Sequence, residues 1–295
     1  MMGRREFCLG AAGVMTLTGP RAEAGERLRA IDTHAHVFLK SLPAAPGRRY
    51  TPDYDAPTAT YLKMLADNGI DRGVLVQPSF LGVDNSYLTA ALVAHRDKLR
   101  GIAVVAENTG VKELAKLKQA GVVGIRLNLI GQPTPDFTTP GWKIHLARVA
   151  ALGWLVEVQA EAARLPAIAP TILAAGLRLV VDHFGRPDAT LGIADPGFRY
   201  LLDLGRGGDT WVKLSGTYRL APGERGRTIA REAAAVLHDH FGSSRLMWGS
   251  DWPHTQFEKV TDYLSARAAL DVWFPNARER RHVLLDTPRK LFGFR

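Results

Sequence analysis

Two histidines stand two residues apart near the start of the chain, in the segment Ile31-Asp32-Thr33-His34-Ala35-His36. Successive side chains of a β-strand point to opposite faces, so His34 and His36 would point the same way if this segment is extended. Imidazoles placed side by side can bind a metal ion or carry protons during a reaction. The spacing therefore indicates a site for one of these two chemistries at the end of a strand.

Other side chains that can bind, polarise or accept a proton follow short apolar runs later in the chain. His183 ends the run LRLVVDH, Asp251 ends RLMWGSD, and Arg126 lies in VVGIRLN. If these runs are parallel strands of one barrel, their carboxyl ends meet at one mouth. The sequence thus predicts that three imidazoles and one carboxylate surround a common opening.

The elements that must position these residues alternate regularly. Runs rich in β-branched residues predict strands at 30–32, 73–79, 101–105, 122–128, 154–159, 177–183, 211–216 and 245–251. Segments with helical periodicity predict helices at 58–68, 85–95, 111–120, 143–152, 164–175, 198–204 and 227–241, with a last one after Pro275. This alternation predicts parallel βαβ units, and their number fits a single (β/α)8 TIM-barrel domain over residues 25–295. An open doubly wound sheet is the alternative, but no Gly-rich phosphate loop follows Ile31.

The first 24 residues have a different character from the rest. A twin arginine, Arg4 and Arg5, precedes a weakly apolar run, and Ala22-Glu23-Ala24 follows as a small-x-small cleavage site. This pattern resembles a twin-arginine export signal, which implies removal of residues 1–24 and a periplasmic mature protein. The alternative is an N-terminal extension on a cytosolic enzyme.

Composition narrows the classes of partner. The chain carries a formal net charge of +9, but no run of five or more basic residues, so nucleic-acid binding gains little support and a small anionic ligand fits better. Cys8 is the single cysteine and lies inside the expected signal, which excludes a cysteine nucleophile from the mature protein. No long apolar stretch predicts a membrane span in the mature form. A homo-oligomer remains open.

Four motifs in a fixed order carry a family resemblance: DTHAH, VVDHFGRPD, WVKLSGTYR and WGSDWPHT. From about residue 31 to 292 the chain resembles the amidohydrolase superfamily, and within it the lactonase branch that includes 2-pyrone-4,6-dicarboxylate lactonase and related sugar-lactone and muconolactone hydrolases. The resemblance implies that His34, His36, His183 and Asp251 form the catalytic set and hold a metal if one is bound. One divalent metal, zinc first, and no metal at all both stay open. Two metals are not expected, because the fifth strand ends in Glu157 and Gln159 without a bridging lysine.

The implied reaction is the hydrolysis of a lactone that bears a carboxylate. Asp251 would take a proton from the attacking water, while the histidines, or a metal that they hold, stabilise the oxyanion. Forked guanidinium groups recognise carboxylates, so arginines at the mouth favour an anionic lactone or organic acid, although each could instead pair with a structural acid such as Asp182 or Asp188. The arginines concerned are Arg126, Arg186 and Arg219, and the resemblance adds Tyr50, Ser79, Asn85 and His254 as hydrogen-bonding groups of the same pocket.

Two departures and three alternatives accompany this prediction. The stretch LIGQP lacks a further arginine that the pyrone-dicarboxylate enzyme would carry there, and Thr287 precedes Pro288 where an asparagine is expected. A metal-dependent nonoxidative decarboxylase and a lactone isomerase of the same superfamily would use the same residues. An exported organic-acid-binding protein is the alternative without catalysis. The remaining histidines, at 95, 145, 238, 240 and 282, fall in helical segments and are expected at the surface or as helix-capping residues.

Overall fold

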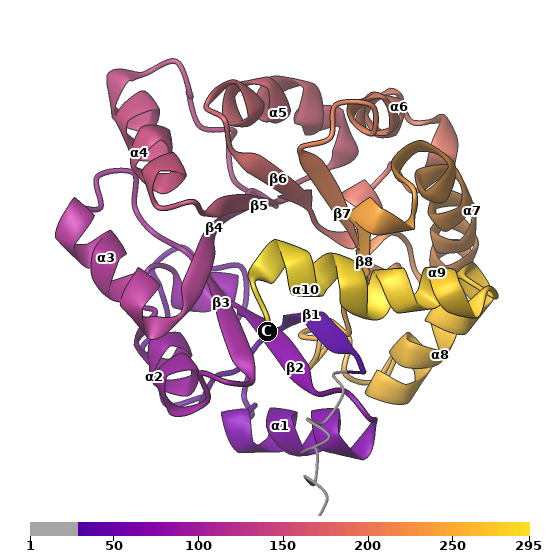
Figure 1. The fold of residues 1–295 in the computed structure, drawn as a ribbon, viewed down its shortest axis with the longest axis horizontal. Coiled ribbons are helices and arrows are strands. Elements are labelled where there is room, and N and C mark those ends of the chain that lie inside the picture. The colour runs from indigo at the N-terminus through magenta and orange to yellow at the C-terminus, as the bar shows by residue number, and fades with distance from the viewer. Residues whose placement is uncertain (1–28) are drawn as a thin grey trace, which may run out of the picture.

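A computed structural model describes residues 29–295 of the chain, and an eight-stranded parallel sheet forms its centre (Figure 1). The strands pair in chain order, each with the next, so the sequence order is also the spatial order. Their bounds are β1 Ile31–Ala35, β2 Arg72–Val76, β3 Leu99–Ala103, β4 Val122–Asn128, β5 Leu155–Gln159, β6 Arg178–Val181, β7 Thr210–Leu214 and β8 Leu246–Trp248. The predicted β/α barrel is confirmed.

The barrel closes where the first strand meets the segment that follows the last. The backbone N–H of His36 donates to the carbonyl of Trp252 (2.7 Å), and that of Asp251 donates to the carbonyl of His34 (2.8 Å). Below them, the Thr33 hydroxyl donates to the carbonyl of Trp248 (2.7 Å). This closure brings two segments more than two hundred residues apart in sequence side by side.

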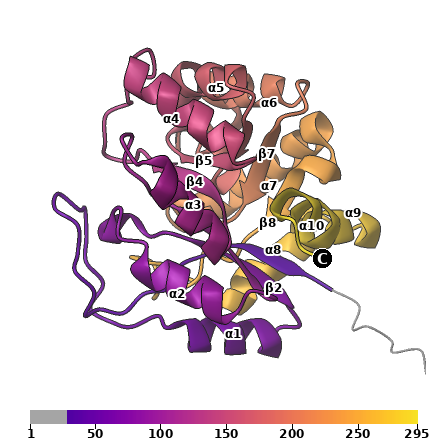
Figure 2. The same ribbon diagram turned by 60° about the vertical axis from the view of Figure 1, so that its left-hand side comes forward.

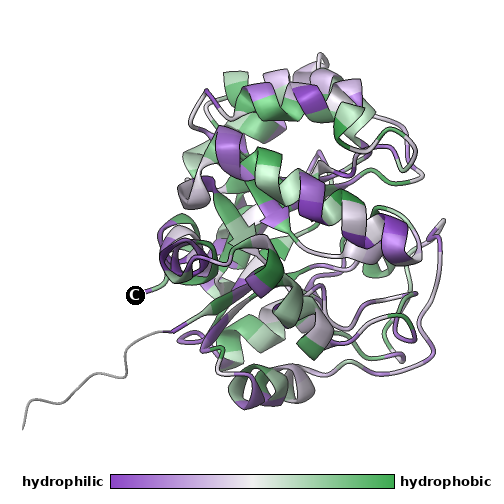
Figure 3. Ribbon diagram, turned by 90° about the vertical axis from the view of Figure 1, so that its right-hand side faces the viewer, coloured by the Kyte–Doolittle hydropathy of each residue, from purple (hydrophilic) through white to green (hydrophobic). Residues whose placement is uncertain are grey.

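Helices surround the strands and carry both hydrophobic and hydrophilic residues, as expected of helices with one buried face (Figure 3). Their bounds are α1 Thr58–Asp67, α2 Ser86–Ala94, α3 Val111–Ala120, α4 Pro140–Ala151, α5 Leu165–Ala174, α6 Pro196–Leu204, α7 Gly223–Phe241, α8 Tyr263–Trp273, α9 Ala277–Arg281 and α10 Thr287–Phe292. Most predicted helices match these bounds within a few residues. The prediction missed α8, which begins where the side chain of Asp262 accepts from the backbone N–H of Ser265.

The C-terminal segment covers the end of the barrel at which the strands begin. Leu291, Phe292 and Phe294 pack in one buried cluster with Ile31 and Leu155, which open β1 and β5. In Figure 2, α10 lies on the same side as the start of β1, whereas the long indigo loop after β1 extends on the other side. The polar residues at the strand ends therefore face an opening that α10 does not cover.

Thr287 has a defined role in holding this C-terminal segment. Its hydroxyl donates to the carbonyl of Ser243 (3.0 Å), which ties the start of α10 to the turn before β8. The expected export signal, residues 1–24, lies outside the described residues. Across 29–295, we find no helix with the length and apolar character needed to span a membrane.

Candidate active site

The residues predicted from the two ends of the chain lie together at the open mouth of the barrel. The Nε2 atoms of His36 and His34 lie 3.5 Å and 3.8 Å from Oδ1 of Asp251. The ring of His34 is centred 5.0 Å from that of His36 and 4.8 Å from that of His183. All four side chains are buried. The cluster thus joins strands β1, β6 and β8, as their polar ends predicted.

Local backbone conformation places these side chains at an energetic cost. His183, Asp251 and His254 have φ values of 49°, 60° and 64°, in the left-handed region that residues with a Cβ rarely adopt. A Cβ on Gly216 would lie 3.0 Å from Oδ2 of Asp251, so this glycine lets β7 approach the carboxylate closely. Strained backbone of this kind concentrates at functional sites, where the surrounding structure maintains it.

Asp251 is the acceptor at the centre of the site. Its Oδ2 accepts from the Tyr218 hydroxyl (2.7 Å) and from Nε of Arg219 (2.5 Å), and its Oδ1 accepts from Nη2 of Arg219 (3.3 Å). Burial alone would raise the pKa of Asp251, but the Arg219 guanidinium and then His183 bring it well below 3.8. Asp251 is therefore a carboxylate at neutral pH, and its Oδ1 faces the histidines.

The histidines of the cluster are neutral. Burial lowers the pKa of His183 to about 3, and it also lowers the pKa values of His34 and His36. His36 Nδ1 lies 2.7 Å from the carbonyl of Val76, which can only accept, so Nδ1 carries the hydrogen and Nε2 offers a lone pair. That lone pair faces the oxygen of Asp251, and two acceptors so placed need a proton or a cation between them.

These donor atoms fit a divalent metal. Ligand atoms of His34, His36 and Asp251 lie within 4.8 Å of one another, and so do those of His34, Asp182 and His183. Nε2 of His34 and of His183 are buried without a hydrogen-bond partner in the part of the chain that the structure describes. Neutral imidazole and carboxylate are the ligands of catalytic zinc sites, which keep one position open. The four predicted ligands divide here between two overlapping groups that share His34.

A network of buried charged residues surrounds His34, on the side away from the cavity mouth. Nζ of Lys213 donates to Glu157 and lies 3.2 Å from Nδ1 of His34, while Asp182 lies within 3.3 Å of the same nitrogen. Arg126 joins the network through Oδ2 of Asp182 (3.2 Å). Burial and the neighbouring Asp182 raise the pKa of Glu157 to about 7. Buried charges persist only when paired, so this network fixes the orientation of His34.

Above the cluster lies a small cavity of roughly 250 Å³, including its open mouth. It contains two predicted arginines, Arg126 and Arg219. Arg126 donates to Asp182, as the alternative of a structural acid predicted, whereas Arg219 donates to Asp251 of the predicted catalytic set. Its lining residues are His36, Arg49, Tyr50, Pro78, Ser79, Arg126, Asn128, Gln159, His183, Arg219 and Thr255.

Two other predicted residues lie beside this cavity. Arg186, in the loop after β6, is largely buried, and its Nε has no hydrogen-bond partner within residues 29–295. His254 accepts or donates at Nδ1 with the Tyr218 hydroxyl, 3.0 Å away. Because that hydroxyl already donates to Asp251, His254 Nδ1 carries the hydrogen.

The structure corrects the prediction at two positions. Asn85 does not line the cavity: its amide donates to the carbonyls of Val83 and Val104, and its oxygen accepts from the backbone N–H of Val104, so it joins the segments after β2 and β3. His145 was expected at the surface but is fully buried in α4, where its ring packs edge-on against Trp142.

Sequence reasoning also missed residues that the fold places in the site. Tyr218, Arg49 and Lys213 were not predicted. Tyr218 directly precedes Arg219, and Arg49 directly precedes Tyr50. Their position next to a predicted site residue was the sequence feature that could have indicated them. Loop conformation decides whether such a neighbour points into the cavity.

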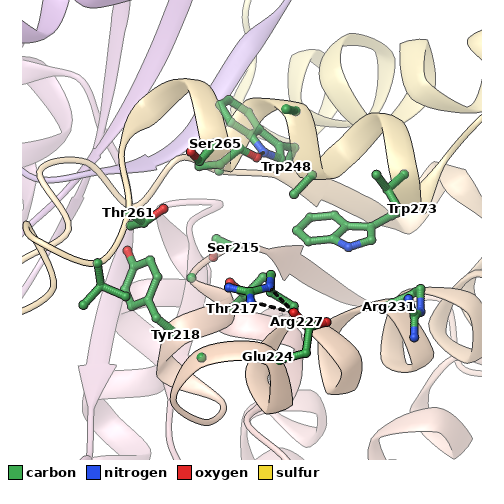
Figure 4. Close-up of a pocket in the computed structure, with 18 residues that line it drawn as sticks. Ser215, Thr217, Tyr218, Glu224, Arg227, Arg231, Trp248, Thr261, Ser265 and Trp273 are labelled. Carbon is green, nitrogen blue, oxygen red and sulfur yellow. Dashed lines mark hydrogen bonds and ion pairs between the residues drawn. The ribbon is translucent and has the colours of Figure 1, made fainter.

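A second, larger cavity of about 1340 Å³, likewise including its open mouth, lies outside the barrel, between α7 and α8 (Figure 4). Trp248 and Trp273 form its aromatic wall, and Arg227 pairs with Glu224 at its edge. The histidine cluster and Asp251 are not among its lining residues. The smaller cavity at the barrel mouth is lined by His36, His183 and three arginines, and it is therefore the candidate active site.

Comparisons with known proteins identify the family of the chain. The family model described as Amidohydrolase matches residues 31–294. The chain is 33% identical over 280 residues to a 2-pyrone-4,6-dicarboxylate hydrolase of Comamonas testosteroni, covering 89% of this chain and 90% of that protein. It is 30% identical over 269 residues to a 4-sulfomuconolactone hydrolase of Hydrogenophaga intermedia, covering 89% and 88% of the two chains.

One solved structure is similar to this chain over most of its length. It is described as a probable 2-pyrone-4,6-dicarboxylic acid hydrolase from Acinetobacter baumannii with citric acid bound. It superposes with a TM-score of 0.88 at 39% identity and covers 90% of this chain and 100% of that one.

Proposed function

Because the chain belongs to the amidohydrolase family, we propose that it is an enzyme that hydrolyses a small lactone bearing at least one carboxylate or equivalent anionic group. The observation that carries this proposal is that Oδ1 of an ionised Asp251 lies within 4 Å of Nε2 of the neutral His34 and His36, beneath a cavity that His36, His183 and arginines line. The relatives whose names specify lactone hydrolysis support it.

Asp251 is proposed as the general base. It is ionised at neutral pH and can accept the proton of a water placed at Oδ1, while Tyr218 and Arg219 hold the carboxylate in position from the other side. The water oxygen forms a bond to the lactone carbonyl carbon, and the ring C–O bond then breaks. Asp251 returns its proton to the departing ring oxygen, so that one water is added overall.

The histidines are proposed to bind the carbonyl oxygen on which negative charge develops. Being neutral and buried, His34 and His183 can donate a ring N–H to this oxygen from their unpartnered Nε2 atoms, whereas Nε2 of His36, which bears a lone pair, would act only through a bound metal. The donor set of His34, His36 and Asp251, with His183 beside it, would hold one divalent metal, zinc being the first candidate. When bound, such a metal would polarise the carbonyl and lower the pKa of water.

The charges around the mouth favour an anionic substrate. Arg126, Arg219 and Lys213 each pair with a protein carboxylate, whereas neither Arg186 nor Arg49 forms an ion pair within residues 29–295. The site therefore has a surplus of positive charge that a carboxylate would neutralise. Tyr50, Ser79 and Thr255 add hydroxyl groups at the same mouth, and we propose that they orient the substrate.

Ring opening in isotopically labelled water tests this proposal. Purified protein is mixed with 2-pyrone-4,6-dicarboxylate or with muconolactone in H₂¹⁸O, and ring absorbance, CO₂ release and ¹⁸O in the product are measured. We expect loss of ring absorbance with one ¹⁸O atom in the new carboxylate. Release of CO₂ would indicate the decarboxylase, a rearranged lactone without ¹⁸O would indicate the isomerase, and binding without turnover would indicate an organic-acid-binding protein.

We further propose that residues 1–24 direct export by the twin-arginine route to the periplasm, on the pattern of Arg4, Arg5 and Ala22-Glu23-Ala24. Expression of the full chain in a bacterium with and without the twin-arginine translocase, followed by fractionation, tests this. Processed protein in the periplasm of the first strain alone is the expected result. Cytoplasmic protein of full length in both strains would contradict it.

A further inference from the structure

Arg49 projects over the mouth of the barrel from the loop between β1 and α1, and other contacts hold that loop in place. The neighbouring Tyr50 hydroxyl lies 3.2 Å from Oγ1 of Thr255, and the Tyr50 ring packs edge-on against Phe80 at 5.4 Å. The Tyr54 hydroxyl donates to Glu258 (2.5 Å). The loop is thus fastened to the segments after β2 and β8, which places Arg49 among the residues that line the cavity.

The guanidinium of Arg49 differs from the other guanidiniums in this cavity. Arg126 and Arg219 donate to the carboxylates of Asp182 and Asp251, respectively. Arg49 makes no hydrogen bond or ion pair with any residue of the described range 29–295, and its only ring contact is with Tyr50, 5.7 Å from the ring centre. Its hydrogen-bond donors therefore remain available to a ligand.

The surroundings of Arg49 are positively charged. Partial burial and then the guanidiniums of Arg219 and Arg126 lower its pKa, so the three charges lie close enough to repel one another. The carboxylate that acts on both Arg49 and Arg186 is Glu161, which is itself paired with Arg164 (3.3 Å). An anion bound between these guanidiniums would relieve the repulsion.

The position of Arg49 is also set from the side of β4. Its Cδ would lie 3.1 Å from a Cβ built on Gly131, in the loop after β4, so the arginine stem rests on a backbone without a side chain. This loop belongs to the stretch LIGQP, which carries no arginine of its own. The positive charge that faces this part of the cavity comes instead from Arg49, in the loop between β1 and α1.

We propose that Arg49 binds a second anionic group of the substrate, a carboxylate or sulfonate remote from the reacting carbonyl, and that it selects doubly charged lactones over singly charged ones. This inference rests on the proposed lactone hydrolysis. Arg49 contacts neither Asp251 nor the histidines, so its interaction is the same in the ground state and the transition state. Such an interaction lowers KM and leaves kcat nearly constant.

The neighbouring Arg48 supplies a matched control. It lies in the same loop, but its guanidinium is used locally, by Oγ1 of Thr51 (2.5 Å) and the carbonyl of Ala45 (3.4 Å). Arg49→Gln and Arg48→Gln therefore remove the same charge from adjacent positions. The two variants and the wild type are assayed with 2-pyrone-4,6-dicarboxylate and with 2-pyrone-6-carboxylate, which has one carboxylate fewer.

The selectivity ratio, kcat/KM for the diacid over kcat/KM for the monoacid, should fall about tenfold in Arg49→Gln, through KM of the diacid. This is the lower end of what a charge-assisted hydrogen bond gives, because the Arg49 side chain is exposed to solvent. Arg48→Gln should keep the wild-type ratio. An equal loss for both substrates, or an equal effect of both variants, would overturn the assignment.

Citrate binding separates this inference from the proposed reaction. If wild-type protein opens neither lactone, the proposed function fails, and the dissociation constant of citrate is then measured by calorimetry for all three proteins. Weaker citrate binding in Arg49→Gln alone would still support Arg49 as an anion receptor. Equal citrate affinity in the wild type and both variants would overturn it independently of turnover.

Discussion

Replacement of Asp251 by asparagine should separate catalysis from stability. The variant keeps the shape of the side chain but cannot accept a proton, and general base catalysis contributes roughly 10²–10⁴ in rate. We therefore expect kcat for ring opening to fall by at least about a hundredfold. Steady-state absorbance assays at saturating substrate measure this loss.

The same substitution should also weaken the fold, because Asp251 is the acceptor for two buried donors. Its carboxylate is fully buried and pairs with Arg219, whose side chain is 11% exposed. Removing one partner of such a pair costs about 3–5 kcal/mol. An asparagine retains one acceptor oxygen, so we expect the lower end. For a domain of this size, 3 kcal/mol corresponds to a decrease in Tm of roughly 6–12 °C, which calorimetry can measure.

A second variant makes the two effects distinguishable. In Asp251→Asn combined with Arg219→Met, the unpaired guanidinium is absent, so part of the lost Tm should return. Activity should not return, because the base is still missing. If Asp251→Asn keeps more than a tenth of wild-type kcat, Asp251 is not the base. If its Tm matches the wild type, the pair with Arg219 does not contribute as its geometry suggests.

Three further predictions follow from the site and from α4. Because Arg126 already donates to Asp182, Arg126→Met should raise KM about equally for a carboxylated and a neutral lactone; a rise confined to the carboxylated lactone would mean that Arg126 also binds the substrate. Elemental analysis should find about one divalent metal per chain. The metal content of His36→Asn should be lower than that of the distant control variant His95→Asn. Undiminished turnover of chelator-treated, metal-free protein would refute a metal requirement. Burial and then Arg148 lower the pKa of His145 in the folded protein, so the unfolded chain takes up this proton at a higher pH than the folded one. The free energy of unfolding should therefore decrease as the pH drops below about 6.5. Between pH 7.5 and 5, the Tm of His145→Phe should decrease less than the Tm of the wild type, and an equal decrease would contradict this.

Much of the fold could be predicted because its signals are local. Each β-branched run and each periodic segment reports the conformation of its own residues, and the alternation of the two restricts the topology to parallel units. The prediction missed α8, although the apolar face of the segment from Tyr263 to Trp273 is as clearly marked as that of α1, which was predicted. It also ended the first strand too early, at Asp32, whereas β1 continues to Ala35 and includes His34.

The sequence by itself determined the family, the barrel, and the mouth at which His34, His183 and Asp251 meet, because side chains at the carboxyl ends of parallel strands converge wherever the barrel closes. Only the tertiary structure decided which charges remain free for a ligand. Whether an arginine faces a carboxylate depends on distances between segments far apart in the chain, and residue type carries no information about them. Arg126 is therefore committed to Asp182, while Arg49, in a loop of no regular structure, keeps its donors available.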